Sequence, residues 1–274
     1  MIRHVSFVRA VLATGLAVLL SAANPARAEV LHVGGTGAAM QMLRQLGAAF
    51  TAHDAGITLE VMPSLGSTGG IAAVADGALD FAVSGRPLKP AEEQSLQASI
   101  LASTPFGFAS SNRQPGNIKS EDVAEFYQST ASVWPDGTPV RVILRPRSES
   151  DTALLEKSFP KLAEAINRAR TRKEIPVAAT DQDNVAMAET ITGSLIAVSL
   201  AQIVTEKPDL HFLTIDGVQP TLENMERGAY PYRKDFYFVF PKRKAPAVER
   251  FIAFLHSKEG ERLLREAGSL TPLP

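Results

Sequence analysis

The sequence predicts an α/β protein with a mainly parallel sheet. Stretches with strand character alternate along the chain with amphipathic stretches of helical periodicity. Loops rich in glycine, serine and threonine stand where expected strands pass into expected helices, as at residues 34–37 and 66–70. Strand, loop and helix in that order are typical of α/β domains. The length of the chain suits one large domain or two small lobes.

The first 28 residues have the pattern of a secretory signal peptide. A basic start with Arg3 and Arg9 precedes an apolar run over residues 10–23, and Ala26 and Ala28 supply the small residues that a signal peptidase recognises. The run is short for a membrane span, although a retained N-terminal anchor helix is the alternative. We therefore expect cleavage after about Ala28 and secretion, with the periplasm as the destination.

Composition excludes several classes of site. The chain has no cysteine, which removes disulfides, thiolate metal sites, a cysteine nucleophile and a lipidated cysteine. Three arginines leave with the signal peptide, which takes the formal net charge from −1 to −4. A weakly acidic chain without basic blocks is poorly suited to nucleic acid or anionic membrane, so we expect no nucleic-acid partner.

In the first part of the mature chain the pattern predicts strands alternating with helices, followed by a passage to a second region. The expected strands are residues 29–33, 57–62 and 79–84, the expected helices are residues 38–53 and about 70–77, and residues 100–109 are apolar and extended. Residues 110–116 are rich in Ser, Asn, Gln and Pro, which indicates a crossover between regions.

The remaining elements follow the same alternation. Strands are expected at residues 140–144, 195–199, 211–215 and 236–240, and helices at residues 120–127, 151–170, 245–256 and 258–267. A further helix is expected after the strand at 211–215 and a loop, ending at about residue 227. The helix at 151–170 is expected to be one long amphipathic element. No internal repeat or low-complexity tract interrupts the pattern.

Three loops share a design that suits anion binding. They are Thr36-Gly37-Ala38, Ser67-Thr68-Gly69-Gly70 and Ser150-Asp151-Thr152, and each precedes an expected helix. A helix N-terminus offers unpaired N–H groups and partial positive charge, glycine admits a ligand close to the backbone, and hydroxyls add donors. Helix capping explains any one loop equally well.

Arginines accompany two of these loops. Arg86 follows one expected strand, and Arg145 and Arg147 precede the third loop. A guanidinium donates through a planar fork that matches a tetrahedral oxyanion and stays charged at physiological pH. The coincidence of three hydroxyl-rich N-termini with arginines favours an oxyanion site over capping alone.

Other polar residues receive structural interpretations. Asp181 and Asp183 lie in a polar loop and are expected to be solvated, and Trp134 is expected to pack in the core. The histidines have no metal-ligand spacing, so we expect no metal and no cofactor. No G-x-S-x-G motif occurs and no serine has an evident histidine partner, which argues against an enzyme.

At these motifs the chain resembles the phosphate-binding proteins of ABC phosphate transporters, within the type 2 periplasmic-binding-protein superfamily. The resemblance covers nearly the whole mature chain. It is carried by Leu65-Gly66-Ser67-Thr68-Gly69-Gly70, by residues 80–84 with Pro87-Leu88, by Arg145 through Ser150-Asp151-Thr152, by residues 191–197 and by Gly228-Ala229-Tyr230-Pro231.

The resemblance implies a two-lobed fold with two chain crossovers and a ligand cleft between the lobes. Lobe 1 would comprise residues 29–108 and 215–274, and lobe 2 residues 109–214. The resemblance implies that the anion-binding hydroxyls are those of Thr36, of Ser67 or Thr68, of Ser150 and of Thr152. Taken together with the loops and arginines, the expected ligand-binding residues are Thr36, Gly37, Ala38, Ser67, Thr68, Ser84, Arg86, Arg145, Arg147, Ser150, Asp151 and Thr152. The spacing leaves open whether Arg145 or Arg147 contacts the ligand.

The chain departs from the family pattern at two positions. The family's acidic residue that accepts a proton from bound phosphate is replaced by Gly85, and the glycine of its S-G-T motif is replaced by Asp151. Asp151 is interpreted either as a substitute acceptor or as a cap of the helix that follows. The loss of the first acid leaves the selection of phosphate over sulfate open.

The function implied is capture of a small inorganic oxyanion, phosphate first, for an ABC permease in the inner membrane. Sulfate, tungstate or molybdate, or an organic phosphate are the alternative ligands. A periplasmic ligand-sensing protein of the same fold is the alternative role.

Overall fold

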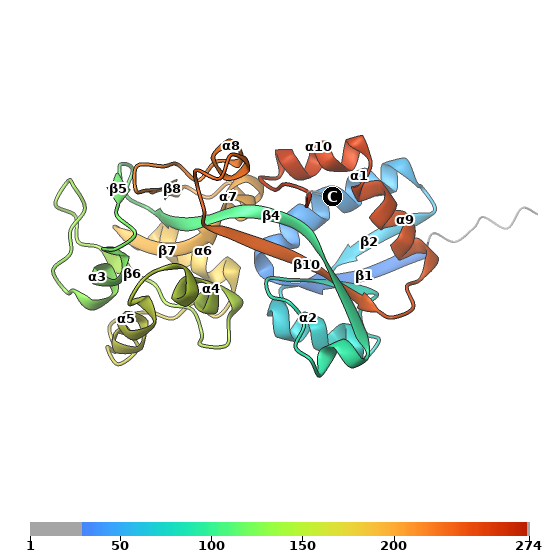
Figure 1. Cartoon of the computed structure of the whole chain (residues 1–274), viewed down its shortest axis with the longest axis horizontal. Coiled ribbons are helices and arrows are strands. Elements are labelled where there is room, and N and C mark those ends of the chain that lie inside the picture. The colour runs from blue at the N-terminus through green and yellow to red at the C-terminus, as the bar shows by residue number, and fades with distance from the viewer. Residues whose placement is uncertain (1–28, 273–274) are drawn as a thin grey trace, which may run out of the picture.

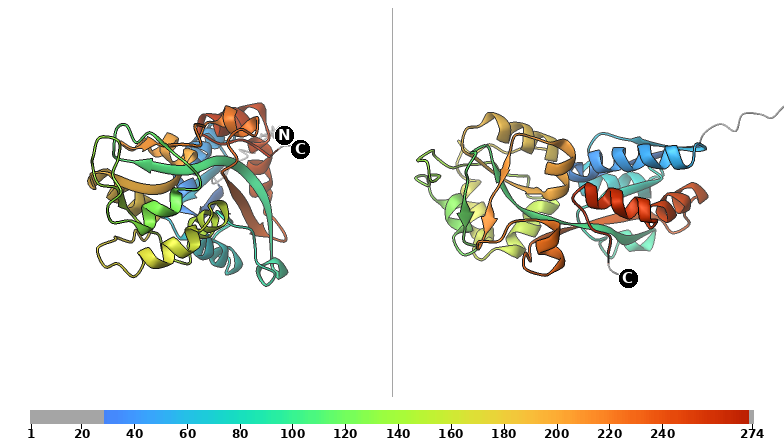
Figure 2. Two further views of the ribbon diagram at one scale, coloured as in Figure 1. Left: turned by 60° about the vertical axis from the view of Figure 1, so that its left-hand side comes forward. Right: turned by 90° about the horizontal axis from the view of Figure 1, so that it is seen from above.

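The computed structural model describes residues 29–272, so the expected signal peptide lies outside the described residues. Figure 1 shows an elongated molecule of two bodies joined by two long strands, β4 (Leu96–Ser110) and β10 (Arg233–Pro241). Figure 2 shows the same division from above. We call the body that contains the N-terminal strand lobe 1 and the other body lobe 2.

Lobe 1 is built on a parallel trio of strands. β1 (Glu29–Gly35) lies between β2 (Ile57–Val61) and β3 (Phe81–Ser84) and pairs in parallel with both. Helices α1, α9 and α10 cover one core and α2 covers the other, with the 3-10 helix η1 preceding α1. Their bounds are Gly37–Ala39 for η1, Met40–His53 for α1, Gly66–Ala75 for α2, Pro246–Leu255 for α9 and Lys258–Glu266 for α10, with η2 at Glu92–Gln94.

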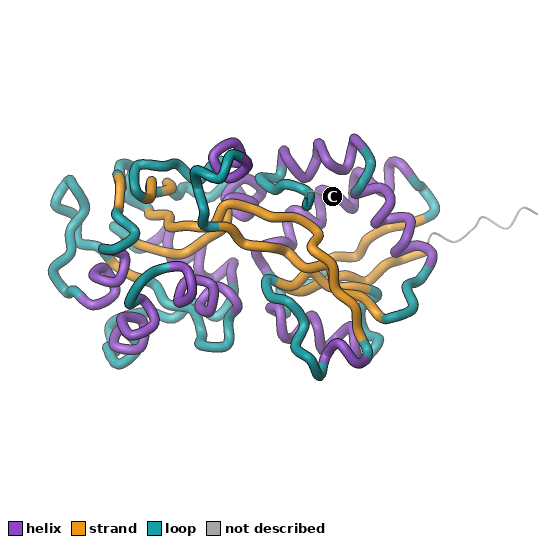
Figure 3. The backbone as a smooth tube through the Cα atoms, in the orientation of Figure 1, coloured by secondary structure: helices purple, strands orange, loops and turns teal. Residues whose placement is uncertain are grey.

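The two long strands carry the chain between the lobes. β10 pairs antiparallel with β3, with Phe238 opposite Val83, which confirms that the expected strand 236–240 belongs to the lobe 1 sheet. β4 pairs with β10 as far as Pro105 opposite Arg233, and from Phe106 onward it pairs with β7 of lobe 2. Figure 3 shows β4 running through both bodies, with β10 beside it from the junction into lobe 1.

Lobe 2 continues the same sheet. The strand order is β2-β1-β3-β10-β4-β7-β6, with β8 beside β4, and β5 pairs separately with β9. The strands are β5 (Asn117–Ile118), β6 (Arg141–Val142), β7 (Ser194–Ser199), β8 (His211–Phe212) and β9 (Thr214–Ile215). The helices are α3 (Val123–Gln128), α4 (Ser150–Ser158), α5 (Leu162–Ala169), α6 (Asp181–Thr190), α7 (Leu200–Glu206) and α8 (Leu222–Glu226).

The α/β fold class is confirmed, but two expectations of local structure are wrong. The sheet is mixed, because β4 and β10 pair antiparallel with each other and with their neighbours. The expected helix 151–170 is two helices, α4 and α5. Pro160 has no N–H for a continuous helix, and Lys161 takes a left-handed φ of 61° before α5 begins.

Apolar side chains from both faces of the sheet form the cores of the two lobes. In lobe 2, Trp134 is 2% exposed and donates its Nε1–H to the Gly193 carbonyl at 3.0 Å, as expected of a packing residue. Within residues 29–272, none of the helices combines the length and apolar character that a bilayer crossing requires. The division of the chain at residues 108 and 215 stays a prediction.

Helix α2 reaches the site region because glycine lets it press against β1. A β-carbon added at Gly70 would lie 2.6 Å from the Cα of Gly35, and Gly35 itself has φ 126° with its own β-position 1.9 Å from the Val83 carbonyl oxygen. These two glycines therefore set how closely the N-terminus of α2 approaches the sheet.

We expect Gly70→Ala to lower the free energy of unfolding by about 1–3 kcal/mol, because the added methyl group overpacks against the backbone of β1. Gly69→Ala is the matched control, since its methyl group would meet the Leu65 side chain at 3.2 Å and both substitutions gain the same helix propensity. Urea unfolding of the two variants measures the difference. Equal urea midpoints for the two variants would show that the close contact of Gly70 with β1 does not affect stability.

Candidate functional site

The three hydroxyl-rich loops meet where the lobes face each other. The N-termini of η1 and α2 come from lobe 1, and those of α4 and α6 come from lobe 2, whose α4 and α6 lie on the side toward lobe 1 (Figure 1). Segments far apart in sequence thus form one buried, polar interlobe site. Its members are described below in the order in which they contact one another.

Two serine hydroxyls form the contact between α2 and α4. The Oγ atoms of Ser67 and Ser150 are 3.4 Å apart, and both residues are at least nine-tenths buried. The backbone N–H of Gly85 donates to Ser67 Oγ at 2.9 Å. The sequence prediction that these loops converge holds for this pair, which joins the two lobes directly.

The N-terminus of η1 binds a carboxylate from lobe 2. The Ala38 N–H donates to Asp181 Oδ2 at 3.1 Å, and the Thr36 hydroxyl donates to the same oxygen at 3.5 Å. Asp181 is the first residue of α6 and is 3% exposed. Our expectation that Asp181 is solvated is wrong, because α6 points its first turn into the interlobe site instead of into water.

Arg145 is the arginine that faces this site. It is 5% exposed, with its Nη2 atom 3.2 Å from Glu149 Oε2 and 3.5 Å from Asp181 Oδ1, and its Nη1 donates to the Ala178 carbonyl at 3.2 Å. Its Nε and Nη2 atoms are buried without a well-aligned hydrogen bond. Arg147 is exposed and donates to Asn167 Oδ1 at 2.6 Å, away from the carboxylates.

A second buried cation, Lys234, was not anticipated from the sequence. It is 1% exposed, its Nζ lies 2.5 Å from Asp151 Oδ1, and the ring centroids of Phe106 and Phe236 are 5.9 and 5.7 Å from Nζ. Asp151 therefore pairs with Lys234, and the N-cap of α4 is Glu149. The interpretation of Asp151 as a cap is wrong.

The same contacts explain the glycine at position 85. A β-carbon there would lie 2.7 Å from Ser150 Oγ and 3.1 Å from Lys234 Cε. The space into which an acidic side chain would project is occupied by the serine and the lysine. An acidic side chain at position 85 would clash with Ser150 and Lys234. The acid of this part of the site is instead Asp151, which pairs with Lys234.

Arg86 has a different role from Arg145. Its guanidinium forms a two-pronged pair with Glu92, with both N–O distances at 2.8 Å. The hydrogen bond from Arg86 lowers the pKa of Glu92 to about 2. Thr68 is exposed and contacts Arg86 Nη2 at 3.4 Å, and the Ser84 hydroxyl donates to the Arg86 carbonyl at 2.7 Å. These contacts stay within lobe 1.

The remaining candidate, Thr152, also makes a local contact, because its hydroxyl donates to the Pro146 carbonyl at 3.1 Å. The structure therefore brings together Thr36, Gly37, Ala38, Ser67, Arg145, Ser150 and Asp151 around the interlobe site. It directs the side chains of Thr68, Ser84, Arg86, Arg147 and Thr152 to other partners.

The charges at the site nearly balance. The cations Arg145 and Lys234 face the carboxylates of Glu149, Asp151 and Asp181. Burial raises the pKa of the Glu149 carboxyl, and the Arg145 guanidinium opposes that rise. For an oxyanion to bind strongly here, the cations and N–H donors must first separate from the carboxylates with which they now pair.

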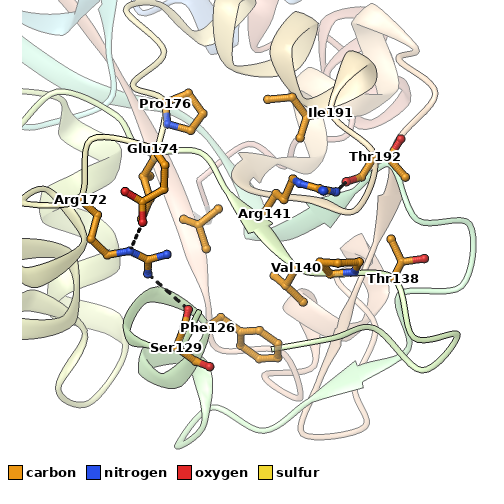
Figure 4. Close-up of a pocket in the computed structure, with 13 residues that line it drawn as sticks. Phe126, Ser129, Thr138, Val140, Arg141, Arg172, Glu174, Pro176, Ile191 and Thr192 are labelled. Carbon is orange, nitrogen blue, oxygen red and sulfur yellow. Dashed lines mark hydrogen bonds and ion pairs between the residues drawn. The ribbon is translucent and has the colours of Figure 1, made fainter. Parts of the chain in front are cut away.

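An open groove of about 810 Å³ lies elsewhere in lobe 2 (Figure 4). Arg172 pairs there with Glu174 at 2.8 Å and reaches the Ser129 carbonyl, and Arg141 donates to the Thr192 carbonyl. Both arginines are thus engaged with protein groups. None of the expected ligand-binding residues lines this groove.

Comparisons with known proteins bear on the fold. A family model described as the PBP superfamily domain matches residues 21–259. A protein from Clostridium perfringens, assigned as a phosphate ABC transporter substrate-binding protein and crystallised with bound phosphate, is similar with TM-score 0.76 and 16% identity, covering 89% of this chain and 100% of that chain. No curated protein matches the sequence.

Two further structures show the breadth of the fold. An ABC-type phosphate transport receptor from Vibrio cholerae has TM-score 0.62 and 18% identity, covering 88% of this chain and 100% of that chain. The Synechocystis PCC6803 CcmR regulatory domain in complex with 2-PG has TM-score 0.54 and 14% identity, covering 83% of this chain and 95% of that chain.

We expect Lys234→Met to lower the free energy of unfolding by about 3–5 kcal/mol, because it leaves the Asp151 carboxylate buried without its cation. The double variant Lys234→Met with Asp151→Asn should recover most of that loss, since no buried charge is then uncompensated. Urea unfolding of both single variants and the double variant gives the coupling energy. Losses that simply add would contradict the pairing.

Proposed function

Because this chain belongs to the PBP superfamily domain family, we propose that it is a solute-binding protein that captures a small tetrahedral oxyanion, phosphate first, in the site between its lobes. One observation carries the proposal. The donor set formed by the Thr36 hydroxyl, the Ala38 N–H and the Arg145 guanidinium already holds a carboxylate, that of Asp181. A carboxylate and a phosphate present similar anionic oxygens to such donors.

The neighbouring groups extend that donor set to a tetrahedral ligand. The hydroxyls of Ser67 and Ser150 are 3.4 Å apart beside it, and each is able to rotate its proton toward an anion. Because these donors come from both lobes, an anion bound among them would hold the lobes together. We propose Thr36, Gly37, Ala38, Ser67, Arg145 and Ser150 as the ligand-contacting residues.

Phosphate is favoured among the oxyanions by the similar proteins, two of which are named for phosphate transport. The same likeness supports delivery of the anion to an ABC permease of the inner membrane, with the protein in the periplasm and no catalytic step. We propose that the lobes open and close about β4 and β10, as binding proteins of hinged design do. The residues expected at the hinge are those where the two strands pass between the lobes, near Pro105 and Arg233.

Gly85 bears on the choice of anion. Monohydrogen phosphate carries a proton that needs an acceptor in a dry site, and sulfate carries none. With glycine at position 85, Asp151 paired to Lys234 and Asp181 on the anion donors themselves, the carboxylate left to accept that proton is that of Glu149. A panel of phosphate, sulfate, molybdate, tungstate and organic phosphates, each measured by calorimetric titration, identifies the ligand.

We expect Arg145→Ala to weaken binding of the preferred anion about 30- to 1000-fold, or roughly 2–4 kcal/mol, because a buried charge-assisted donor is lost. Arg147→Ala and Arg86→Ala are the matched controls, since the one arginine is exposed and the other pairs with Glu92. Both controls should keep the wild-type dissociation constant. Wild-type affinity in folded Arg145→Ala, checked by circular dichroism, would remove Arg145 from the site.

A further inference from the structure

The Asp181 carboxylate occupies the donors that a bound anion would use. The role inferred for Asp181 rests on the proposed function. We propose that Asp181 is an internal competitor of the ligand. Without ligand, its carboxylate binds the oxyanion donors of η1 and so holds the two lobes together, which we call the latch. When an anion binds, the carboxylate leaves those donors. Asp181 would then be a specificity-determining residue that sets how strongly an anion must bind to be captured.

The contacts of Asp181 are those of a bound anion. Its Oδ2 accepts from the Ala38 N–H at 3.1 Å and from the Thr36 hydroxyl at 3.5 Å, and its Oδ1 lies 3.5 Å from Arg145 Nη2. Its side chain is 5% exposed, so bulk water is largely excluded. A buried carboxylate needs such partners, because an uncompensated one is strongly unfavourable.

The packing around Gly37 leaves no room for the carboxylate and a ligand together. A β-carbon added at Gly37 would lie 2.8 Å from Asp181 Oδ2 and 2.5 Å from Gln182 Oε1. The first turn of α6 is therefore pressed against η1. An anion that takes the Ala38 N–H must displace the Asp181 oxygen, and any incomplete displacement leaves two negative groups side by side.

The position of Asp181 is fixed by its neighbours. Thr180 and Asp183 form a reciprocal capping box that sets the start of α6, and Gln202 Nε2 donates to the Asp181 carbonyl at 3.2 Å. Gln182 Nε2 donates to the Gly37 carbonyl at 3.0 Å, which adds a further bond between α6 and η1. The carboxylate is thus held against η1 by a built arrangement rather than by a single flexible contact.

Displacement favours ligands with more oxygens than a carboxylate. A tetrahedral dianion that replaces Asp181 would also reach the Ser67 and Ser150 hydroxyls, whereas the Asp181 carboxylate accepts from Thr36 and Ala38 and from neither serine. A monoanion such as acetate or chloride gains only what Asp181 already gives. The internal carboxylate therefore excludes common weak anions while admitting a dianion.

Two substitutions separate competition from latching. Asp181→Asn keeps the side-chain shape and removes the charge, and it should tighten phosphate binding at least about tenfold, because like-charge repulsion and competition are both relieved. The gain should extend to acetate. Asp181→Ala removes the bonds that the carboxylate makes to η1, and it should raise the radius of gyration in buffer without oxyanions. Glu189→Gln is the matched control, since that acid is exposed near the other end of α6.

Calorimetric titration with phosphate, sulfate and acetate gives the affinities, and small-angle X-ray scattering gives the radius. Tighter binding in Asp181→Asn with wild-type behaviour of Glu189→Gln supports the proposal. Phosphate affinity in Asp181→Asn equal to or below wild type overturns the competition. If neither the wild type nor Asp181→Asn binds any anion of the panel, the proposed function fails. The scattering tests the latch independently, because an unchanged radius of gyration in Asp181→Ala would overturn the latch.

Discussion

The antiparallel pairing of β4 with β10 is the constraint on which the rest of the structure depends. These strands pair from Leu96 opposite Pro241 to Pro105 opposite Arg233, and β4 then enters the lobe 2 sheet at Phe106. One ladder therefore joins the two lobes and determines where they can move relative to each other. It also places Lys234, opposite Thr104 on β4, at the point where the site needs a cation.

Around that ladder the interlobe site is organised by charge compensation. Lobe 1 supplies helix N-termini and hydroxyls, lobe 2 supplies Arg145 with Glu149, Asp151 and Asp181, and β10 supplies Lys234. In a medium of low dielectric constant each of these charges would be costly alone, but each lies next to an opposite charge or a hydrogen-bond donor. Position 85 has no acid, and position 151 has one that pairs with Lys234. The balance of charge at the site is therefore kept by different residues.

Sequence reasoning predicted the parts of the fold and site that depend on local pattern. The strands, most helices, the convergence of Ser67 with Ser150 and the placement of an arginine near the third loop follow from periodicity, loop composition and the resemblance. Asp181 and Lys234 were missed because their partners are distant in sequence and their neighbours are ordinary for a polar loop and a strand. The Pro160 break was readable from the residue itself, whereas the antiparallel course of β4 leaves no mark in the pattern.

The place of Trp134 decides which spectroscopic signals report on lobe closure. The chain has one tryptophan and no cysteine. Trp134 bonds to the Gly193 carbonyl, just before β7 begins, while Arg145 follows the parallel neighbour β6, so the indole and the interlobe site lie at opposite ends of these strands. Its emission therefore follows the unfolding of lobe 2 and is insensitive to the cleft. Because the chain has no thiol of its own, two cysteines introduced one per lobe could be labelled with dyes specifically. Energy transfer between the dyes would then measure the distance between the lobes as they close.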